Sequence, residues 1–136
     1  MATKVGTEPM PDPGRTPGQT FPGVTTAEVC TGGWATAHRD VTGTERHQVF
    51  ASYGIPYSQH DSYELDHLIP LELGGDNAEA NLWPELGHIP NLKDHLENVL
   101  HGDVCSGRVG LATAQHAIAT NWWAAYQTYV GGTTVQ

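Results

Sequence analysis

Residues 63–100 read YELDHLIPLELGGDNAEANLWPELGHIPNLKDHLENVL and carry the pattern that decides the fold. The apolar residues before the glycines fall in short extended patterns that Pro70 interrupts: Leu65, Leu68, Ile69, Leu71 and Leu73. The following GGDN sequence, residues 74–77, is typical of a turn, because glycine and short polar side chains tolerate the backbone angles of tight turns. The sequence therefore predicts a strand followed by a turn.

A second strand and a helix follow this turn. Residues 81–84, NLWP, predict a short strand that Pro84 ends. Over 91–100 the apolar residues recur at the spacing of one helix face, and Gly102 is expected to end that helix: Leu92, Leu96, Val99 and Leu100. The order strand, turn, strand, helix predicts a small ββα unit at about 63–101.

The rest of the chain predicts helices around this unit and an irregular start. Its expected elements are an irregular arm over 1–24, a short strand or turn within 24–41, a helix over 44–53 that Thr44 caps, and one long helix over 111–130. Trp122 lies on the apolar stripe of the long helix, so we expect it in the core and not on a base-stacking surface. Together these elements predict an α+β fold with one domain over 25–136, a length typical of a single domain.

Polar residues suited to hydrolysis fall at the ends of these elements. Asp66 and His67 end the first strand, Asn81 opens the second, and Asn91 begins the helix that carries His95. Hydrolysing a phosphodiester requires a base that activates water and a cation beside the leaving oxygen. A neutral imidazole suits the first task, and a carboxylate with an amide or imidazole from a facing helix can hold the cation. The pattern therefore indicates a metal-dependent hydrolase.

These motifs resemble the HNH endonuclease family, whose fold is named ββα-metal. The segments DHLIPLELGGDN at 66–77, NLWPE at 81–85 and KDHLE at 93–97 are similar to a bacterial and phage branch of that family. Shorter similarities run from Pro11-Asp12-Pro13 to the helix that holds Trp122, so the resemblance covers most of the chain. The chain departs from zinc-bound relatives because it lacks paired Cys-x-x-Cys motifs.

The resemblance implies a role for each residue of the motif. The general base of the family corresponds to His67, and the metal ligand before it corresponds to Asp66. The middle asparagine, which braces the loop that carries the base, corresponds to Asn81. The second metal ligand, on the helix, would be Asn91 or His95. The implied reaction is hydrolysis of DNA that leaves 5′-phosphate and 3′-hydroxyl ends.

The choice between the two helix ligands is open on geometry, because residues four apart on a helix point the same way. Asn91 lies ten residues after Asn81, where the family usually places its last ligand. An Asp–Asn pair suits Mg²⁺, whereas His95 is the stronger ligand for zinc-like ions. We therefore expect Mg²⁺ on Asp66 and Asn91 with His95 as an accessory ligand, and Asp94 facing away. Mn²⁺, Zn²⁺ and Ni²⁺ are alternative metals.

The charge of the chain opposes a DNA-cutting function. Six Lys and Arg stand against fifteen Asp and Glu, a net charge of −9, whereas nucleases gain affinity from cations that neutralise phosphates. The candidate phosphate contacts are Lys93, Arg39 and Arg46, whereas Glu85 is expected to be solvated. The competing hypothesis is a non-cutting nucleic-acid- or protein-binding module on an HNH-like core. The sequence contains no apolar run long enough to span a membrane, and it leaves the oligomeric state open.

Cys30 and Cys105 are too few and too far apart for a zinc knuckle. They are either two buried thiols or one long-range disulfide of an exported protein. Both cysteines follow valine and precede a small residue, and a bond between them would tie the N-terminal segment to the region after the predicted catalytic helix. We predict the disulfide.

Overall fold

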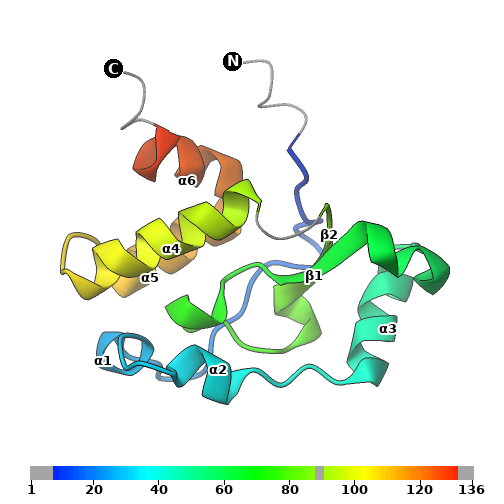
Figure 1. The fold of residues 1–136 in the computed structure, drawn as a ribbon, viewed down its shortest axis with the longest axis horizontal. Helices are drawn as coiled ribbons and strands as arrows, with labels where there is room; N and C mark the ends of the chain where they lie inside the picture. Colours follow the sequence, from blue (N-terminus) through cyan, green and yellow to red (C-terminus); the bar gives the residue numbers. More distant parts are fainter. Residues whose placement is uncertain (1–7, 88–90, 132–136) are drawn as a thin grey trace.

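A computed structural model describes residues 8–87 and 91–131, which form six α-helices and one β-hairpin (Figure 1). The regular elements are α1 Thr26–Val29, α2 Trp34–His38, α3 Gly43–Ser52, β1 Tyr63–His67, β2 Leu82–Leu86, α4 Leu92–Cys105, α5 Leu111–Thr120 and α6 Trp122–Tyr129. Short 3-10 helices lie between them: η2 Tyr57–Ser62, η3 Leu71–Leu73 and η4 Glu79–Asn81. The fold is a small α+β domain, as the sequence predicts.

The two strands form a hairpin in which the end of β1 lies beside the start of β2. β1 and β2 pair antiparallel, with Asp66 opposite Trp83 and His67 opposite Leu82. Both strands were predicted, but β2 continues through Pro84 to Leu86. Proline is tolerated there because each strand of a two-stranded sheet is an edge, with backbone N–H groups that need no partner strand.

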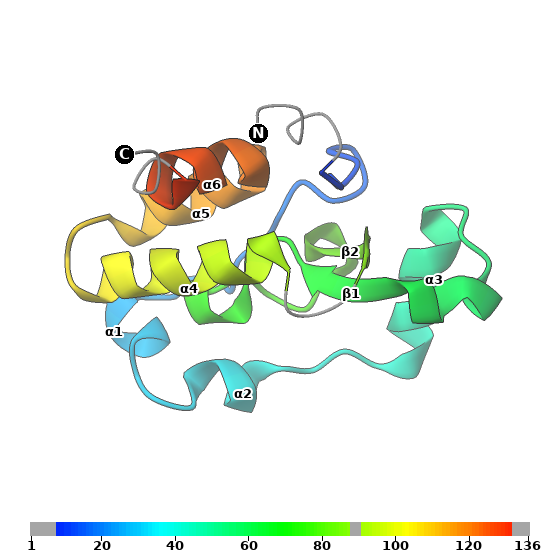
Figure 2. The same ribbon diagram turned by 45° about the horizontal axis from the view of Figure 1, so that its top comes forward.

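Helix α4 leaves the hairpin with its first turn close to the strands, and it packs beside α5 and α6 (Figures 1 and 2). Helix α3 packs against β2, and α1 and α2 lie at the lower edge of Figure 1, where both contact η3. The largest buried cluster lies between the hairpin and α4–α6; its members include Leu68, Leu73, Trp83, Leu96, Leu100, Ile118 and Trp122. Trp122 is therefore a core residue, as predicted.

Other elements also differ from the sequence prediction, beginning with α3, whose cap is Thr42 and not Thr44. Residues 24–41 hold two short helices and no strand, and the Thr25–Glu28 capping box begins the first of them. The predicted long helix is two helices, because Asn121 takes an extended conformation and caps α6 through the backbone N–H of Ala124. Helix α4 passes through Gly102 and ends at Cys105, so it is the longest helix described.

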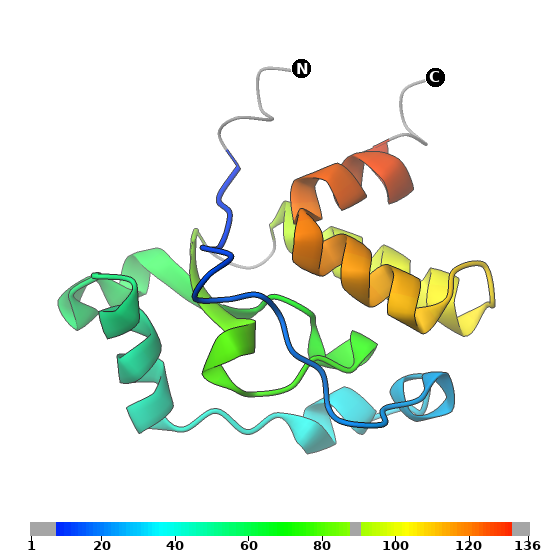
Figure 3. The same ribbon diagram turned by 180° about the vertical axis from the view of Figure 1, so that it is seen from behind.

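The N-terminal arm is irregular, as predicted, but it is packed against the domain. Its backbone crosses the loop between the strands (Figure 3), where Phe21 N–H donates to the Gly74 carbonyl and Gly18 N–H donates to that of Ala80. The side chain of Thr16 is buried. Residues 1–7 of the arm and 132–136 of the predicted domain lie outside the described residues. Among the described helices, none combines the length and the apolar character that crossing a membrane requires.

A disulfide between Cys30 and Cys105 joins the end of α1 to the end of α4. The bond confirms the predicted pairing, and it closes a sequence separation of 75 residues. Because α1 is only four residues long, this covalent link and the burial of Val29 hold it against α4.

Candidate functional site

A cavity of about 140 Å³ lies between the end of β1 and the first turns of α4. Its charged and titratable lining consists of Arg39, Glu64, Asp66, His67, Asp94 and Glu97. Leu65, Pro70 and Leu71 complete the wall. The structure therefore brings Asp66 and His67 to one polar cavity, together with carboxylates that the sequence analysis had not assigned to a site.

Three carboxylates converge on one point of this cavity. An oxygen from each of Glu64, Asp66 and Asp94 lies within 4.8 Å of the other two. The first two are two residues apart on β1, so their side chains share a face of the strand, and Asp94 reaches them from the first turn of α4. Oxygen ligands from two elements at this spacing suit a hard divalent cation such as Mg²⁺, Mn²⁺ or Ca²⁺.

Lys93 contacts the cluster of Glu64, Asp66 and Asp94 through Asp66 and is fully buried. Its ammonium group is 2.7 Å from a carboxylate oxygen of both Asp66 and Glu97, and it donates to the backbone carbonyl of His67 at 3.0 Å. Burial alone would lower the pKa of Lys93, but the two carboxylates outweigh it and raise the pKa. The predicted phosphate contact of Lys93 is not compatible with this position, because the side chain has no exposed surface.

Burial, together with the crowding of negative charge, raises the pKa of three carboxyl groups around the cavity. Burial, followed by the charges of Asp66 and Asp94, raises the pKa of Glu64 to about 7. Burial also raises the pKa of Glu97 to about 8, although the charge of Lys93 opposes that shift. The pKa of Asp94 is raised by burial as well. One buried lysine does not balance these groups, so a bound cation would relieve the repulsion between them.

The contacts of Asp66 leave one oxygen for a cation. Its Oδ2 accepts a hydrogen bond from the indole N–H of Trp83 at 2.8 Å and also forms the ion pair with Lys93. Both contacts fix the carboxylate and both involve Oδ2, so Oδ1 is the atom that can act as a ligand. The donors present therefore fit a metal ion on Asp66, Glu64 and Asp94.

Asn77 fixes the tautomer of His67. The amide nitrogen of Asn77 donates to the His38 carbonyl at 2.8 Å, and its Oδ1 accepts from the backbone N–H of Asp40 at 3.2 Å. These partners assign Oδ1 as an acceptor, so the His67 Nε2 that lies 3.0 Å from it must carry the proton. Nδ1 is then the nitrogen with a lone pair that can accept a proton from water.

The imidazole of His67 is kept neutral. The residue is only 7% exposed, and burial lowers its pKa against the opposing effect of the hydrogen bond with Asn77. A lowered pKa means that the ring is in its basic form throughout the neutral range. His67 therefore has the protonation state that a general base needs.

Asn81 braces the loop that follows His67, which is the role the resemblance implies. Its side chain accepts from Ile69 N–H and donates to the carbonyls of Ile69 and Asp76, each at 2.9 Å. Gly75 packs so closely against this loop that a Cβ there would lie 1.7 Å from the Ile69 carbonyl oxygen. The loop geometry thus depends on a buried amide and on the missing side chain of a glycine.

The helix side of the site differs from the prediction. Asp94 was expected to face away from His67, yet it lines the same cavity. Asn91 caps α4 by accepting from Asp94 N–H, and its Nδ2 donates to Glu64 at 3.2 Å. His95 is exposed, and its ring lies 6.4 Å from that of Tyr126 on α6. The structure therefore places Asn91 beside the carboxylate cluster and does not bring His95 to it.

Three residues of the site were not predicted from the sequence: Glu64, Asn77 and Glu85. Glu64 could have been predicted, because it lies two residues before Asp66 and so on the same face of the strand. The hydrogen bond between Asn77 and His67 could not, because it depends on the path of a loop. Glu85 was expected to be solvated, but it is 2% exposed and lies opposite Glu64 in the hairpin. Burial raises the pKa of Glu85 to about 9, with the charge of Asp66 as the next cause. Glu85 is therefore protonated at neutral pH.

Arg39 lines the cavity, whereas Arg46 is not among its lining residues. Of the three predicted phosphate contacts, Arg39 is therefore the one that the fold places at the site.

In comparisons with models of known protein families, with curated proteins and with solved structures, nothing matches this chain.

Proposed function

We propose that this protein is a metal-dependent endonuclease of the HNH type that hydrolyses phosphodiester bonds in DNA. One observation carries the proposal: a neutral histidine with a fixed tautomer shares a cavity with three converging carboxylate oxygens from β1 and α4. General-base catalysis and cation binding are the two requirements of phosphodiester hydrolysis, and both sets of groups meet here.

Each residue has a separate task in the proposed reaction. Glu64, Asp66 and Asp94 would hold the divalent ion, which when bound supplies positive charge beside the phosphate and the leaving 3′-oxygen. Nδ1 of His67 accepts the proton of the attacking water, while Nε2–H remains bonded to Asn77. Arg39 is the cation that can meet a phosphate oxygen at the edge of the cavity.

A non-cutting binding module is the second candidate, and the charge distribution favours it. The net charge is −9, and Lys93 is buried among carboxylates. A phosphodiester approaching Glu64, Asp66 and Asp94 without a cation would be repelled. The nuclease hypothesis therefore requires that cleavage depends strictly on a divalent ion.

Plasmid cleavage separates the two candidates. Supercoiled plasmid would be incubated with the purified protein and Mg²⁺ or Mn²⁺, with EDTA as the metal-free control. We expect nicking or linearisation with metal, none with EDTA, and a loss of roughly 10²–10⁴-fold in His67→Ala, the usual effect of removing a general base. His116→Ala, at an exposed site on α5, is the matched control. Cleavage that survives in His67→Ala would refute the assignment, and no cleavage by the wild type with either metal would favour the binding module.

A further inference from the structure

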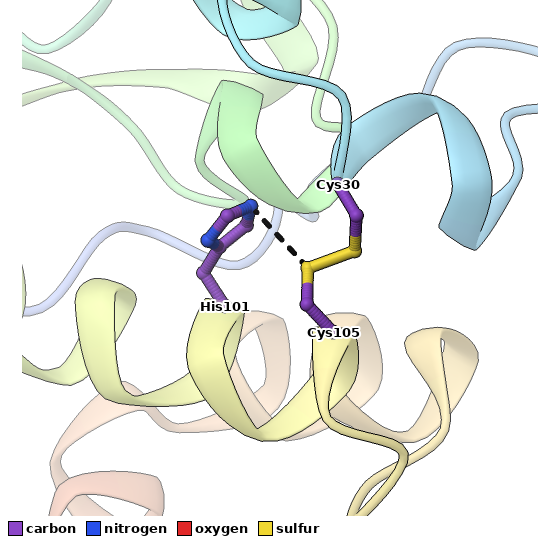
Figure 4. A group of neighbouring side chains, drawn as sticks. All are labelled: Cys30, His101 and Cys105. Carbon is purple, nitrogen blue, oxygen red and sulfur yellow. Dashed lines mark hydrogen bonds between the residues drawn. A yellow bond between two sulfur atoms is a disulfide. The ribbon is translucent and has the colours of Figure 1, made fainter.

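A second group of metal-ligating side chains lies away from the cavity, where α1 meets the end of α4 (Figure 4). Cys30 and Cys105 form the disulfide, and Nε2 of His101 lies 3.6 Å from the Cys105 sulfur. One ligand atom from each of these three residues lies within 4.8 Å of the others. Nothing in the proposed nuclease reaction uses this cluster.

The fold holds the three residues together by more than the disulfide. His101 and Cys105 are four apart on α4, so they lie on the same face of the helix. Cys30 ends α1, and Nε2 of His101 donates to the carbonyl of its neighbour Val29 at 2.9 Å. Val29 is also buried, so part of the contact between α1 and α4 remains when the sulfur–sulfur bond is broken.

We propose that the reduced protein binds a thiophilic cation, with Zn²⁺ as the type, through Cys30, Cys105 and His101. Two thiolates and one imidazole are the donors that Zn²⁺ prefers, and three protein ligands leave a fourth position for water. Thiolates that share a tetrahedral zinc at about 2.3 Å lie roughly 3.8 Å apart, which a Cα–Cα distance of 5.8 Å accommodates. The disulfide and the metal complex are therefore alternative states of one site.

An external dithiol can reduce the disulfide and so convert the protein to the metal-binding state in a balanced reaction. The dithiol transfers two electrons and two protons to the disulfide, which yields two cysteine thiols and the cyclic disulfide of the reductant. Binding of the cation then releases the two thiol protons to solvent. His101 must also move its ring proton from Nε2 to Nδ1 before Nε2 can be a ligand. The lost hydrogen bond to Val29 opposes binding.

Soft and hard cations distinguish this site from the carboxylate cluster at the cavity. Glu64, Asp66 and Asp94 offer only oxygen, and they are present in both redox states. Sulfur ligands exist only in the reduced protein. A spectroscopic signal from metal–sulfur bonds therefore reports this site alone, whatever the carboxylates bind and whether or not the protein cuts DNA.

Titration with Co²⁺, a spectroscopic substitute for Zn²⁺, tests the proposal. Protein reduced with a phosphine and handled without oxygen should develop a sulfur-to-cobalt charge-transfer band, and protein with the intact disulfide should not. Zn²⁺ should displace the cobalt. The affinity of His101→Ala for Co²⁺ should be lower by at least about tenfold, since even outer-shell partners of a metal ligand contribute that much. His116→Ala should bind as the wild type does.

Circular dichroism of the reduced protein makes the outcome decisive even if reduction unfolds it. In that case we expect Zn²⁺ to restore the native spectrum, because a metal that binds only the folded form stabilises that form. The proposal is overturned if the charge-transfer band does not appear with Co²⁺, or if the His101→Ala protein binds Co²⁺ as tightly as the wild type does. The second result would mean that the two thiolates bind metal without the imidazole.

Discussion

Asn77 decides which nitrogen of His67 can accept a proton, and the proposed reaction depends on that choice. Removing the acceptor in Asn77→Ala would allow both neutral tautomers and a freer ring. We expect cleavage to fall by roughly 10–100-fold, in the range seen when an outer-shell partner that orients a histidine is lost. Binding of metal should be unchanged, because Asn77 does not line the cavity.

Asn77→Asp gives the matched comparison, because it keeps the acceptor and adds a negative charge. The charge would favour the imidazolium form and raise the pKa of His67. We therefore expect the acidic limb of the pH–rate profile to move to higher pH, with cleavage largely retained above that limb. A profile that does not move, or equal loss of cleavage in both variants, would mean that Asn77 acts only on folding.

Glu64 makes the metal requirement depend on pH. Its pKa of about 7 means that a proton and the cation compete for the same carboxylate near neutral pH. The Mg²⁺ concentration that supports half-maximal cleavage should therefore fall as the pH rises through 7. In Glu64→Gln this concentration should be higher and should vary less with pH, whereas Glu79→Gln, at an exposed position, should behave as the wild type. A requirement in Glu64→Gln equal to that of the wild type would exclude Glu64 as a ligand.

At the scale of the element, the N-terminus of α4 connects helix stability to the metal site. Asn91 and Asp94 form a reciprocal capping box, and Asn91 also donates to Glu64. Asn91→Ala should lower the free energy of unfolding by about 1 kcal/mol, the usual effect of losing such a cap. It should also raise the Mg²⁺ needed for cleavage, because the Glu64 carboxylate loses the hydrogen bond that positions it.

His95→Ala is the control for this prediction, because His95 lies on the same helix but does not line the cavity. We expect its Mg²⁺ requirement to match that of the wild type. Thermal unfolding and the Mg²⁺ dependence of cleavage would be measured for both variants. A larger Mg²⁺ effect in His95→Ala than in Asn91→Ala would show that the helix ligand is the imidazole.

The order of the elements around the site could be predicted from local sequence patterns, but the directions of the side chains at the site could not. Apolar spacing and turn residues predicted β1, β2 and α4 at nearly their observed positions. The direction of Asp94 was predicted wrongly, because Asn91 was expected to be a helical residue. Asn91 is the cap and has extended backbone angles, so the rule for residues four apart does not apply to it. Burial of Lys93 instead turns this end of α4 toward β1.

At the scale of the whole molecule, the exposure of two charged residues was predicted wrongly, because both are buried in the fold. The expectation that Glu85 is solvated and that Lys93 meets phosphate follows from the usual exposure of charged residues. In this fold the hairpin and α4 enclose both, with Asp66 between them in the charge network. Such pairing depends on tertiary contacts between residues distant in the sequence, which local patterns do not contain. The pairing of the disulfide was predictable because two cysteines allow a single intrachain pair.

The buried carboxyl groups should make the metal-free protein less stable as the pH rises. Glu64, Glu85 and Glu97 have a pKa of about 7, 9 and 8 in the folded protein, against an ordinary value of 4.5. Between pH 4.5 and these raised pKa values, the folded state therefore binds more protons than the unfolded state does. The stabilisation is complete below pH 4.5 and is lost as the pH rises through 7 to 9. His67, whose pKa is lowered, affects stability only at acidic pH.

Glu85→Gln tests this dependence, because the amide keeps the shape of the side chain and cannot lose a proton. Urea unfolding in EDTA would give the free energy of unfolding between pH 6.5 and 9. We expect it to fall with pH in the wild type and to fall less steeply in Glu85→Gln, since the remaining decline comes from Glu64 and Glu97. Glu79→Gln, which removes an exposed carboxylate, should follow the wild type. If the wild type gains stability toward pH 9, or if Glu85→Gln keeps the full slope, Glu85 is not protonated in the folded protein.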